Sequence, residues 1–266
     1  MILVDAYWLL HKCRHSLDFL KTSKGVLTGM EYGFLKSCEA LERDLKDKAV
    51  LCWESRSFRY DLYSNYKAGR ESKLDPSRVS MFKDFCKQVY RNAEHEGLEA
   101  DDVIASLCGK EQTIIYSNDK DLLQLIDKQT VQLKSFQDKK FPWDEDTVQL
   151  KMFGLYPAEL PYFFAWIGDG VDNIPGSGIR QSRIASAIVW ARQGRRIRDW
   201  PVWNANELRI LDSWEPRLDL FVLRRENVEI QEPIWDQAVI EKWLVKMEIA
   251  SLKLCGRVGM FKESEF

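Results

Sequence analysis

The stretch Thr113-Ile114-Ile115-Tyr116-Ser117-Asn118-Asp119-Lys120-Asp121 decides the fold, because a short apolar run opens directly on two acidic residues. The β-branched and aromatic residues 113–116 predict a buried strand, and the polar residues after them predict its end. Residues 1–4 followed by Asp5 repeat the pattern at the start of the chain. Acids just past the carboxyl ends of strands lie where open α/β sheets bind their ligands.

Strand and helix patterns alternate over the first 160 residues. Four segments have the apolar character of buried strands: residues 1–4, 49–53, 113–116 and 130–133. Helical spacing of apolar residues separates them. This alternation predicts an α/β fold with a mostly parallel sheet flanked by helices.

Three helices are predicted between these strands. Thr28 and Glu31 have the spacing of a capping box at the start of the first helix. Asp75 and Pro76 are typical of the N-cap and first turn of the second. The third is predicted over residues 99–108.

The second part of the chain has a different pattern. Strand signals fade beyond about residue 160, and helical patterns continue nearly to Phe266. We therefore expect a first domain at residues 1–160 and a mostly helical region at residues 161–266.

The charge is nearly balanced overall but is unevenly distributed. The 266 residues are 45% apolar and 30% charged, with a formal charge of −2, which fits a folded protein and excludes a uniformly basic nucleic-acid binder. Residues 56–91 nevertheless hold nine Lys or Arg against four acids, and residues 180–198 hold six Arg and no acid. Two local basic surfaces are therefore predicted.

Several classes of protein are excluded by composition. The six cysteines occur singly, which argues against a zinc ribbon or a disulfide scaffold and favours buried free thiols in a reducing cytosol. No apolar stretch is long enough to predict a membrane span. The N-terminal residues lack the basic leader of a signal peptide, so we do not expect one. His11 and His15 have a zinc-compatible spacing, but the sequence suggests no third ligand nearby.

Clustered carboxylates are the strongest chemical signal. Two unit charges about 5 Å apart repel by roughly 3 kcal/mol at an effective dielectric constant of about 20, so converging acids need cations between them. Divalent metal ions suit this role. Taken singly, the clusters have simpler explanations, such as an acidic helix start or an Asx-turn. The acidic clusters comprise eight residues: Asp5, Glu99, Asp101, Asp102, Asp119, Asp121, Asp169 and Asp172.

Taken together, these motifs resemble the 5′-nuclease family, which comprises flap endonucleases, phage 5′-3′ exonucleases and the 5′-nuclease domains of bacterial DNA polymerase I. The resemblance covers residues 2 to about 190. The matching segments are Ile2-Leu3-Val4-Asp5, Phe58-Arg59, Tyr66-Lys67-Ala68-Gly69-Arg70, Glu99-Ala100-Asp101-Asp102, Ser117-Asn118-Asp119-Lys120-Asp121 with Gln124-Leu125, Gly168-Asp169 and Asp172-Asn173-Ile174-Pro175-Gly176.

The resemblance implies a PIN-like (Rossmann-like) catalytic domain that binds two Mg²⁺ ions per active site, with Mn²⁺ as a substitute. In the family pattern, Asp5, Glu99, Asp101 and Asp102 serve the first ion, directly or through water. Asp119, Asp121, Asp169 and Asp172 serve the second. Glu54 stands near the position of a further family acid, and could be either a metal ligand or a salt-bridge partner.

The basic segment at about 55–90 matches the family's arch over the active site. Lys67 and Arg70 occupy positions that draw the scissile phosphate toward the metals, which makes them candidate catalytic residues. Arg59 and Tyr66 are candidate DNA contacts. Tyr60, Tyr63 and Tyr66 could stack on unpaired bases or could bury their rings against the protein.

The resemblance also implies a helix–three-turn–helix at about 168–192 that grips duplex DNA. Its candidate contacts are Gly176, Gly178, Arg180 and Arg183. Arg180 replaces the second glycine of the family's hairpin, which argues against the K⁺ site that this hairpin often forms.

The function implied is hydrolysis of DNA phosphodiesters near a 5′ end, flap or junction, in DNA replication, repair or recombination. We expect a monomeric cytoplasmic enzyme of the stand-alone kind found in bacteria and phages. Two alternatives remain: a catalytically silent DNA-junction binder of the same fold, and a PIN-type ribonuclease.

Overall fold

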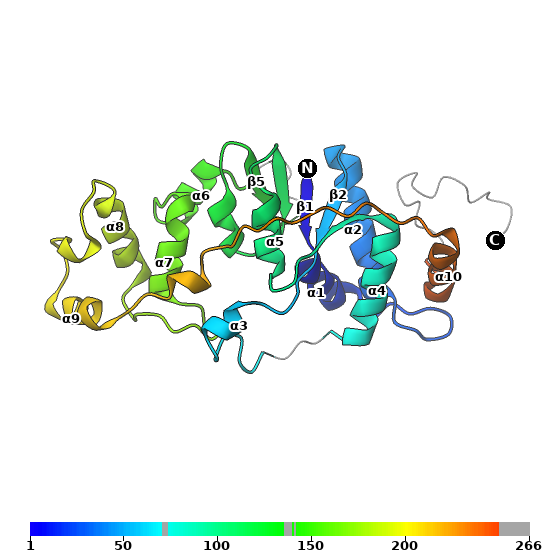
Figure 1. Cartoon of the computed structure of the whole chain (residues 1–266), viewed down its shortest axis with the longest axis horizontal. Coiled ribbons are helices and arrows are strands. Elements are labelled where there is room, and N and C mark those ends of the chain that lie inside the picture. The colour runs from blue at the N-terminus through cyan, green and yellow to red at the C-terminus, as the bar shows by residue number, and fades with distance from the viewer. Residues whose placement is uncertain (71–73, 136–139, 141, 250–266) are drawn as a thin grey trace.

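The computed structural model describes residues 1–70, 74–135, 140 and 142–249. Within them, one five-stranded parallel sheet has the order β3-β2-β1-β4-β5 (Figure 1). Val4 of β1 lies beside Leu51 of β2 on one side and Tyr116 of β4 on the other. The strands are β1 (Ile2–Asp5), β2 (Ala49–Cys52), β3 (Arg91–Ala93), β4 (Thr113–Tyr116) and β5 (Thr130–Leu133).

The α/β fold and the four predicted strands are confirmed, but β3 was not predicted. Its three residues include the polar pair Arg91 and Asn92, which lack the apolar character of a buried strand. Asn92 is nevertheless buried, because its Oδ1 accepts a hydrogen bond from Trp53 Nε1 at 2.7 Å and its Nδ2 donates to the Tyr90 carbonyl at 2.6 Å. These partners satisfy a side chain that sequence patterning assigns to a loop.

Helices cover both faces of the sheet because side chains alternate along each strand. Ile2 and Val4 of β1 pack in one core with α1 (Ala6–Leu17), α2 (Gly29–Leu45) and α4 (Pro76–Val89). Leu3 points to the other face, where α5 (Ala100–Leu107) packs.

The predicted capping box at the start of α2 does not form. The Thr28 hydroxyl donates instead to the Met247 carbonyl at 3.1 Å. The Glu31 carboxylate pairs with Arg78 of α4, 2.6 Å from its Nε. Tertiary partners have therefore displaced the local capping contacts, while the helix still begins at Gly29.

A second core lies beside the β5 end of the sheet (Figure 1). It contains residues of α6 (Glu145–Lys151), α7 (Leu160–Ile167), α8 (Gln181–Ala191) and α9 (Ala205–Ser213), and of the 3₁₀ turns η1 (Asp121–Leu125), η4 (Ile197–Asp199) and η5 (Leu218–Leu220). The turn η3 (Pro157–Glu159) precedes α7, and the short α3 (Arg59–Leu62) follows β2.

The described chain beyond α9 returns across the molecule, so residues 161–249 do not form one separate region (Figure 1). The last described helix, α10 (Gln237–Met247), packs on α4, where the ring centroids of Trp243 and Phe85 are 3.8 Å apart. Ile240 and Leu244 belong to the same core as β1. The predicted boundary near residue 160 is therefore wrong for the last part of the chain.

Two composition-based predictions can be checked against the described residues. Five cysteines are buried free thiols, as predicted: Cys13, Cys38, Cys52, Cys86 and Cys108. Cys255 lies outside the described residues. No described helix has the length and apolar character needed to cross a membrane.

Candidate active site

A cleft of about 1060 Å³ lies at the carboxyl ends of the strands. The strand order reverses between β1 and β4, and Asp5 and Asp119 follow these two strands, at the position where open α/β sheets bind ligands. Five separate segments bring acidic side chains to its walls. These acids are Asp5, Glu54, Glu99, Asp101, Asp119, Asp121, Asp169 and Asp172.

Asp5 and Asp119 are connected through one hydroxyl. Ser117 Oγ donates to Asp5 Oδ2 at 2.9 Å and accepts from the Asp119 amide at 3.1 Å. Asp5 Oδ1 accepts from the Trp8 amide at 3.0 Å and so caps α1. Asp119 Oδ1 accepts from the Asp121 amide at 2.8 Å, which holds the two acids of this loop together.

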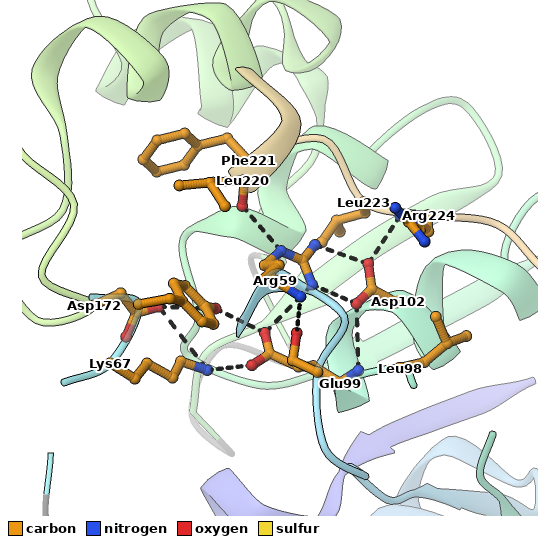
Figure 2. A network of polar contacts seen from close by, with 12 residues as sticks. Arg59, Lys67, Leu98, Glu99, Asp102, Asp172, Leu220, Phe221, Leu223 and Arg224 are labelled. Carbon is orange, nitrogen blue, oxygen red and sulfur yellow. Dashed lines mark hydrogen bonds and ion pairs between the residues drawn. The ribbon is translucent and has the colours of Figure 1, made fainter. Parts of the chain in front are cut away.

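Glu99, at the start of α5, faces the basic segment. Lys67 Nζ lies 2.6 Å from Glu99 Oε1 (Figure 2). Tyr66 Oη donates to Glu99 Oε2 at 2.9 Å. Asp101 lies one residue into the helix and also lines the cleft. The helix N-terminus favours negative charge at both positions.

Asp169 and Asp172 lie in the turn between α7 and α8. Asp169 Oδ1 accepts from the Val171 amide at 2.8 Å, which is the Asx-turn that the sequence favoured for this motif taken alone. Its other oxygen lies 2.9 Å from Lys120 Nζ. Asp172 Oδ1 lies 3.0 Å from Arg70 Nη1. The turn therefore combines a local structural role with a position in the cleft.

Burial and mutual repulsion act against the charged forms of the innermost acids. Burial, with the nearby Asp119 carboxylate, raises the pKa of Asp5 to about 7. The same two causes raise the pKa values of Asp101 and Asp121 well above the usual range. Burial also raises the pKa of Glu54. A cation placed among these acids would stabilise their charged forms.

The donor set fits a divalent ion that prefers oxygen ligands. Asp121 Oδ1 is buried and has no hydrogen-bond partner among the described residues. Among the described residues no Lys or Arg forms an ion pair with Glu54, although the charges of Lys67 and Arg70 are near enough to act on its carboxylate. As the side chains stand, no three acid, His or Cys groups of the described residues enclose one common point. Glu99, Asp169 and Asp172 each turn toward a Lys or Arg instead.

Asp102 and Arg59 are the clearest departures from the predicted site. Asp102 is fully buried and is not part of the cleft wall. Arg59 binds it in a bidentate pair, with Nη1–Oδ2 at 2.6 Å and Nη2–Oδ1 at 2.9 Å (Figure 2). Arg59 lines the cleft but is only 2% exposed, and its guanidinium is engaged by carboxylates, so in this conformation it supports the site, and its DNA contact stays a prediction.

The predicted arch is shorter than residues 55–90, and its tyrosines differ in exposure. Residues 76–89 form α4, which packs in the core and does not overhang the cleft. Tyr66 is buried against Glu99, which prevents stacking on a base. Tyr60 is 38% exposed, lines the cleft, and contacts the Tyr66 ring edge-on.

The predicted duplex-binding residues are also in different environments. Gly176 and Gly178 lie in the α7–α8 turn, where Gly178 has a φ of +78°. Arg180 is exposed at the start of α8. The guanidinium of Arg183, in contrast, pairs with Glu207 and lies over the rings of Trp200 and Trp203. Arg183 therefore joins α8 to α9, and its predicted DNA contact is not supported by this geometry.

Sequence reasoning assigned no role to three residues that shape the site. Lys120 pairs with Asp169, Ser117 connects two of the acids, and Gln124 binds the chain segment that returns from α9. All three lie in or beside the acidic motif at 117–125, so their position in the sequence was the available signal. The returning segment itself carries no motif.

The chain is similar to known proteins over most of its described length. A family model described as "5'-3' exonuclease, N-terminal resolvase-like domain" matches residues 1–153. A 5′-3′ exonuclease of Aquifex aeolicus (strain VF5) is 33% identical over 189 residues, which are 66% of this chain and 64% of that protein. The thermostable DNA polymerase I of Thermus aquaticus is 32% identical over 190 residues, 66% of this chain and 22% of the polymerase. The chain thus matches less than two thirds of these relatives.

Solved structures show the same fold. The bacteriophage T5 D15 protein co-crystallised with metal ions has a TM-score of 0.64 at 17% identity, covering 93% of this chain and 98% of the T5 protein. Human GEN1 in complex with Holliday junction DNA has a TM-score of 0.60 at 15% identity, covering 93% of this chain and 67% of that one.

Proposed function

Because this chain belongs to the 5′-3′ exonuclease family, we propose that it is a metal-dependent, structure-specific 5′-nuclease that hydrolyses DNA phosphodiesters near a 5′ end, flap or junction. One observation carries the proposal. Acids from five segments line a single cleft, and Lys67 and Arg70 line it too.

The cleft acids would hold the metal ions, with Asp5, Glu99 and Asp101 on one side and Asp119, Asp121, Asp169 and Asp172 on the other. In this proposal Asp102 is not a metal ligand but supports the site through its pair with Arg59, and Glu54 is included among the ligands. Divalent ions bound there would supply an activated water and charge stabilisation for in-line displacement at phosphorus. We propose Mg²⁺ as the ion, two per site, with Mn²⁺ as a substitute.

Lys67 and Arg70 have the placement needed to bind the reacting phosphate. Their charged groups lie 2.6 Å and 3.0 Å from cleft carboxylates, so a phosphate at the cleft would lie within their reach. Burial acts against the charge on Lys67, but Glu99 and Asp172 raise its pKa, which keeps the ammonium group protonated. A fixed positive charge at this place would stabilise the charge that builds on the phosphate.

DNA is the favoured substrate class. The T5 D15 flap endonuclease was crystallised in a complex with DNA and metal ions, and GEN1 with Holliday junction DNA. Arg180 and the backbone of Gly178 are exposed on the α7–α8 turn beside the cleft, where they could contact a duplex backbone. We propose that this helix–turn–helix is the duplex grip, that the protein acts as a cytoplasmic monomer, and that Arg180 disfavours K⁺ binding.

One assay tests the proposal. Labelled 5′-flap DNA, blunt duplex DNA and single-stranded RNA are each incubated with Mg²⁺ or with a chelator, using the wild type and Asp119→Asn. We expect Mg²⁺-dependent cleavage of DNA near the 5′ end, and its loss in the variant. Asp146→Asn, which removes an exposed acid on α6, is the matched control and should cleave normally.

Other outcomes select the alternatives. Binding of flap DNA without cleavage in Mg²⁺ or Mn²⁺ would identify a silent junction binder. Cleavage of the RNA alone would identify a PIN-type ribonuclease. Either result would end the proposal of a DNA 5′-nuclease.

A further inference from the structure

Residues 218–226, which we call the return segment, adjoin the site, and their Leu220 and Leu223 line the cleft, although they fall outside the region matched by the family model. After η5 this segment has no regular secondary structure. It is held in place by side chains of three elements that carry or adjoin the candidate acids: α3, α5 and η1.

Arg59 of α3 makes the first set of contacts. Its Nε donates to the Leu220 carbonyl at 3.0 Å (Figure 2). Its Nη2 donates to the Val222 carbonyl at 3.4 Å. The same guanidinium binds Asp102 and lies 3.4 Å from Glu99 Oε2. One side chain thus connects the return segment with the start of α5.

Two further hydrogen bonds attach the return segment to α5. The Arg224 amide donates to Asp102 Oδ1 at 2.8 Å (Figure 2). The Glu226 amide donates to Ser106 Oγ at 3.0 Å, and Ser106 Oγ donates in turn to the Asp102 carbonyl at 2.7 Å. The buried Asp102 carboxylate is therefore satisfied partly by backbone that lies more than 100 residues away in sequence.

Gln124 connects the return segment to the other acidic loop. Its Nε2 donates to the Phe221 carbonyl at 2.9 Å, and its Oε1 accepts from the Leu223 amide at 3.2 Å. The same Nε2 donates to the Asp121 carbonyl at 2.8 Å. This amide is therefore bound on one side to the return segment and on the other to the backbone of a candidate metal ligand.

We propose that the return segment is a positioning element of the metal site, with Gln124 as its principal positioning residue. This inference rests on the proposed function, because it assumes that the cleft acids bind metal. Its physical basis is that the segment fixes Glu99 and Asp121, on two different elements, relative to one another. Residues that orient metal ligands in this way typically change metal affinity or activity about 10- to 100-fold when they are removed.

The test measures Mn²⁺ binding by the full chain without DNA, together with urea unfolding. Gln124→Ala removes the contacts to Phe221, Leu223 and Asp121 without adding charge. We expect it to weaken Mn²⁺ binding roughly tenfold or more, with a matching rise in the Mg²⁺ concentration needed for half-maximal cleavage. Ser106→Ala, which releases the Glu226 amide, should change the affinity in the same direction.

Gln88→Ala is the matched control. Gln88 Oε1 accepts from the Asp236 amide at 3.2 Å, so it anchors the same C-terminal part of the chain at a place outside the cleft wall. This variant should bind Mn²⁺ like the wild type.

Wild-type Mn²⁺ affinity in Gln124→Ala would overturn the inference, whether or not its stability in urea falls. Loss of affinity in Gln88→Ala equal to that in Gln124→Ala would also overturn it, because the effect would then be a general consequence of loosening the chain. A wild-type protein that binds no Mn²⁺ would instead overturn the proposed function, and this inference with it.

Discussion

Lys67 has a backbone conformation that few residues other than glycine adopt, with a φ of +51°. Its amide donates to the Asp172 carbonyl at 2.9 Å, which holds the turn against the α7–α8 region. Such a conformation costs about 1–3 kcal/mol and persists only where the surroundings impose it. Here it coincides with a lysine whose ammonium group lies among cleft carboxylates, which supports a functional role for the side chain.

Lys67→Ala should therefore reduce cleavage far more than DNA binding. Removing one charge that acts on the reacting phosphate should lower turnover by about 10²–10³-fold. Equilibrium binding should change much less, because many phosphates contribute to it. Single-turnover cleavage and a binding titration in Ca²⁺, on the same 5′-flap DNA, measure the two effects.

Lys151→Ala is the matched control, since Lys151 is exposed on α6. It should leave both quantities unchanged. If Lys67→Ala weakened binding as much as it slowed turnover, Lys67 would be a plain binding residue.

Residue identity alone predicted which acids matter, but not how each of them is used. Eight of the nine candidate ligands do line the cleft. Asp102 is the exception, and nothing in the text Glu99-Ala100-Asp101-Asp102 distinguishes it from its neighbours. Its role depends on Arg59, which lies 43 residues earlier and meets it only in the folded chain. Partners at such separations are decided by tertiary packing.

At the scale of elements, the α7–α8 turn is built on a close backbone approach. A Cβ added to Gly176 would lie 2.0 Å from the Ile167 carbonyl oxygen, and one added to Gly168 would lie 2.4 Å from the Gly176 amide. Neither neighbour is a flexible side chain that could move aside. The two glycines therefore permit the turn that presents Asp169 and Asp172 to the cleft.

Gly176→Ala should thus destabilise the protein and impair cleavage together. The overpacked backbone predicts a loss of about 1–3 kcal/mol in the free energy of unfolding, measured by urea denaturation. Gly170→Ala provides the comparison within the same turn, because no atom lies within 4 Å of its added Cβ. Equal stability of the two variants would contradict the packing argument.

Arg180, the N-cap residue of α8, and Arg183, within the helix, lie three residues apart and should behave differently. Arg180→Ala should weaken duplex binding and reduce the slope of log K against log salt by about 1, as expected for one lost phosphate contact. Arg183→Ala should lower the melting temperature without changing that slope, because its side chain is engaged by Glu207 and two tryptophan rings.

Binding titrations at several salt concentrations, with thermal melts of both variants, separate the two roles. A reduced salt slope for Arg183→Ala would show that its pairing with Glu207 opens when DNA binds.

Periodicity predicted the elements whose apolar residues repeat regularly, and failed where burial depends on polar partners. The helix at Pro76–Val89 followed from Val79, Phe82 and Cys86. Strand β3 did not, because Asn92 is buried only through bonds to Trp53 and Tyr90. The same helix shows why the predicted arch was too long. The apolar side of the helix faces the core, even though the surrounding sequence is basic.

At the scale of the whole molecule, the chain travels between the two ends of the molecule twice, once in each direction. It proceeds from the sheet to the α7–α9 region, then returns past the site to α10 beside α4 (Figure 1). The helical patterns predicted nearly to Phe266 do not extend through residues 214–236, where only the 3₁₀ turn η5 is helical. Side chains of other segments hold this stretch in place. Its position depends on contacts such as Gln124–Phe221, which only the fold reveals.

The buried acids make a final prediction for the molecule as a whole. Burial and the Asp119 carboxylate both disfavour charge on Asp121, so the metal-free fold is destabilised by its own site. A divalent ion that binds the native state alone should raise the free energy of unfolding by about 2.7 kcal/mol at 100 times its Kd. Thermal unfolding with Mg²⁺ and with chelator measures this increment.

Asp121→Asn provides the critical comparison. It removes the charge, so the metal-free variant should melt at a higher temperature than the metal-free wild type, while most of its Mg²⁺-dependent increment disappears. Asp146→Asn, on the exposed side of α6, should keep the full increment. Replacing an acid should raise metal-free stability and also remove the Mg²⁺-dependent increment only if that acid both destabilises the metal-free fold and binds the ion. Equal Mg²⁺ increments in Asp121→Asn and the wild type would exclude Asp121 from the metal site.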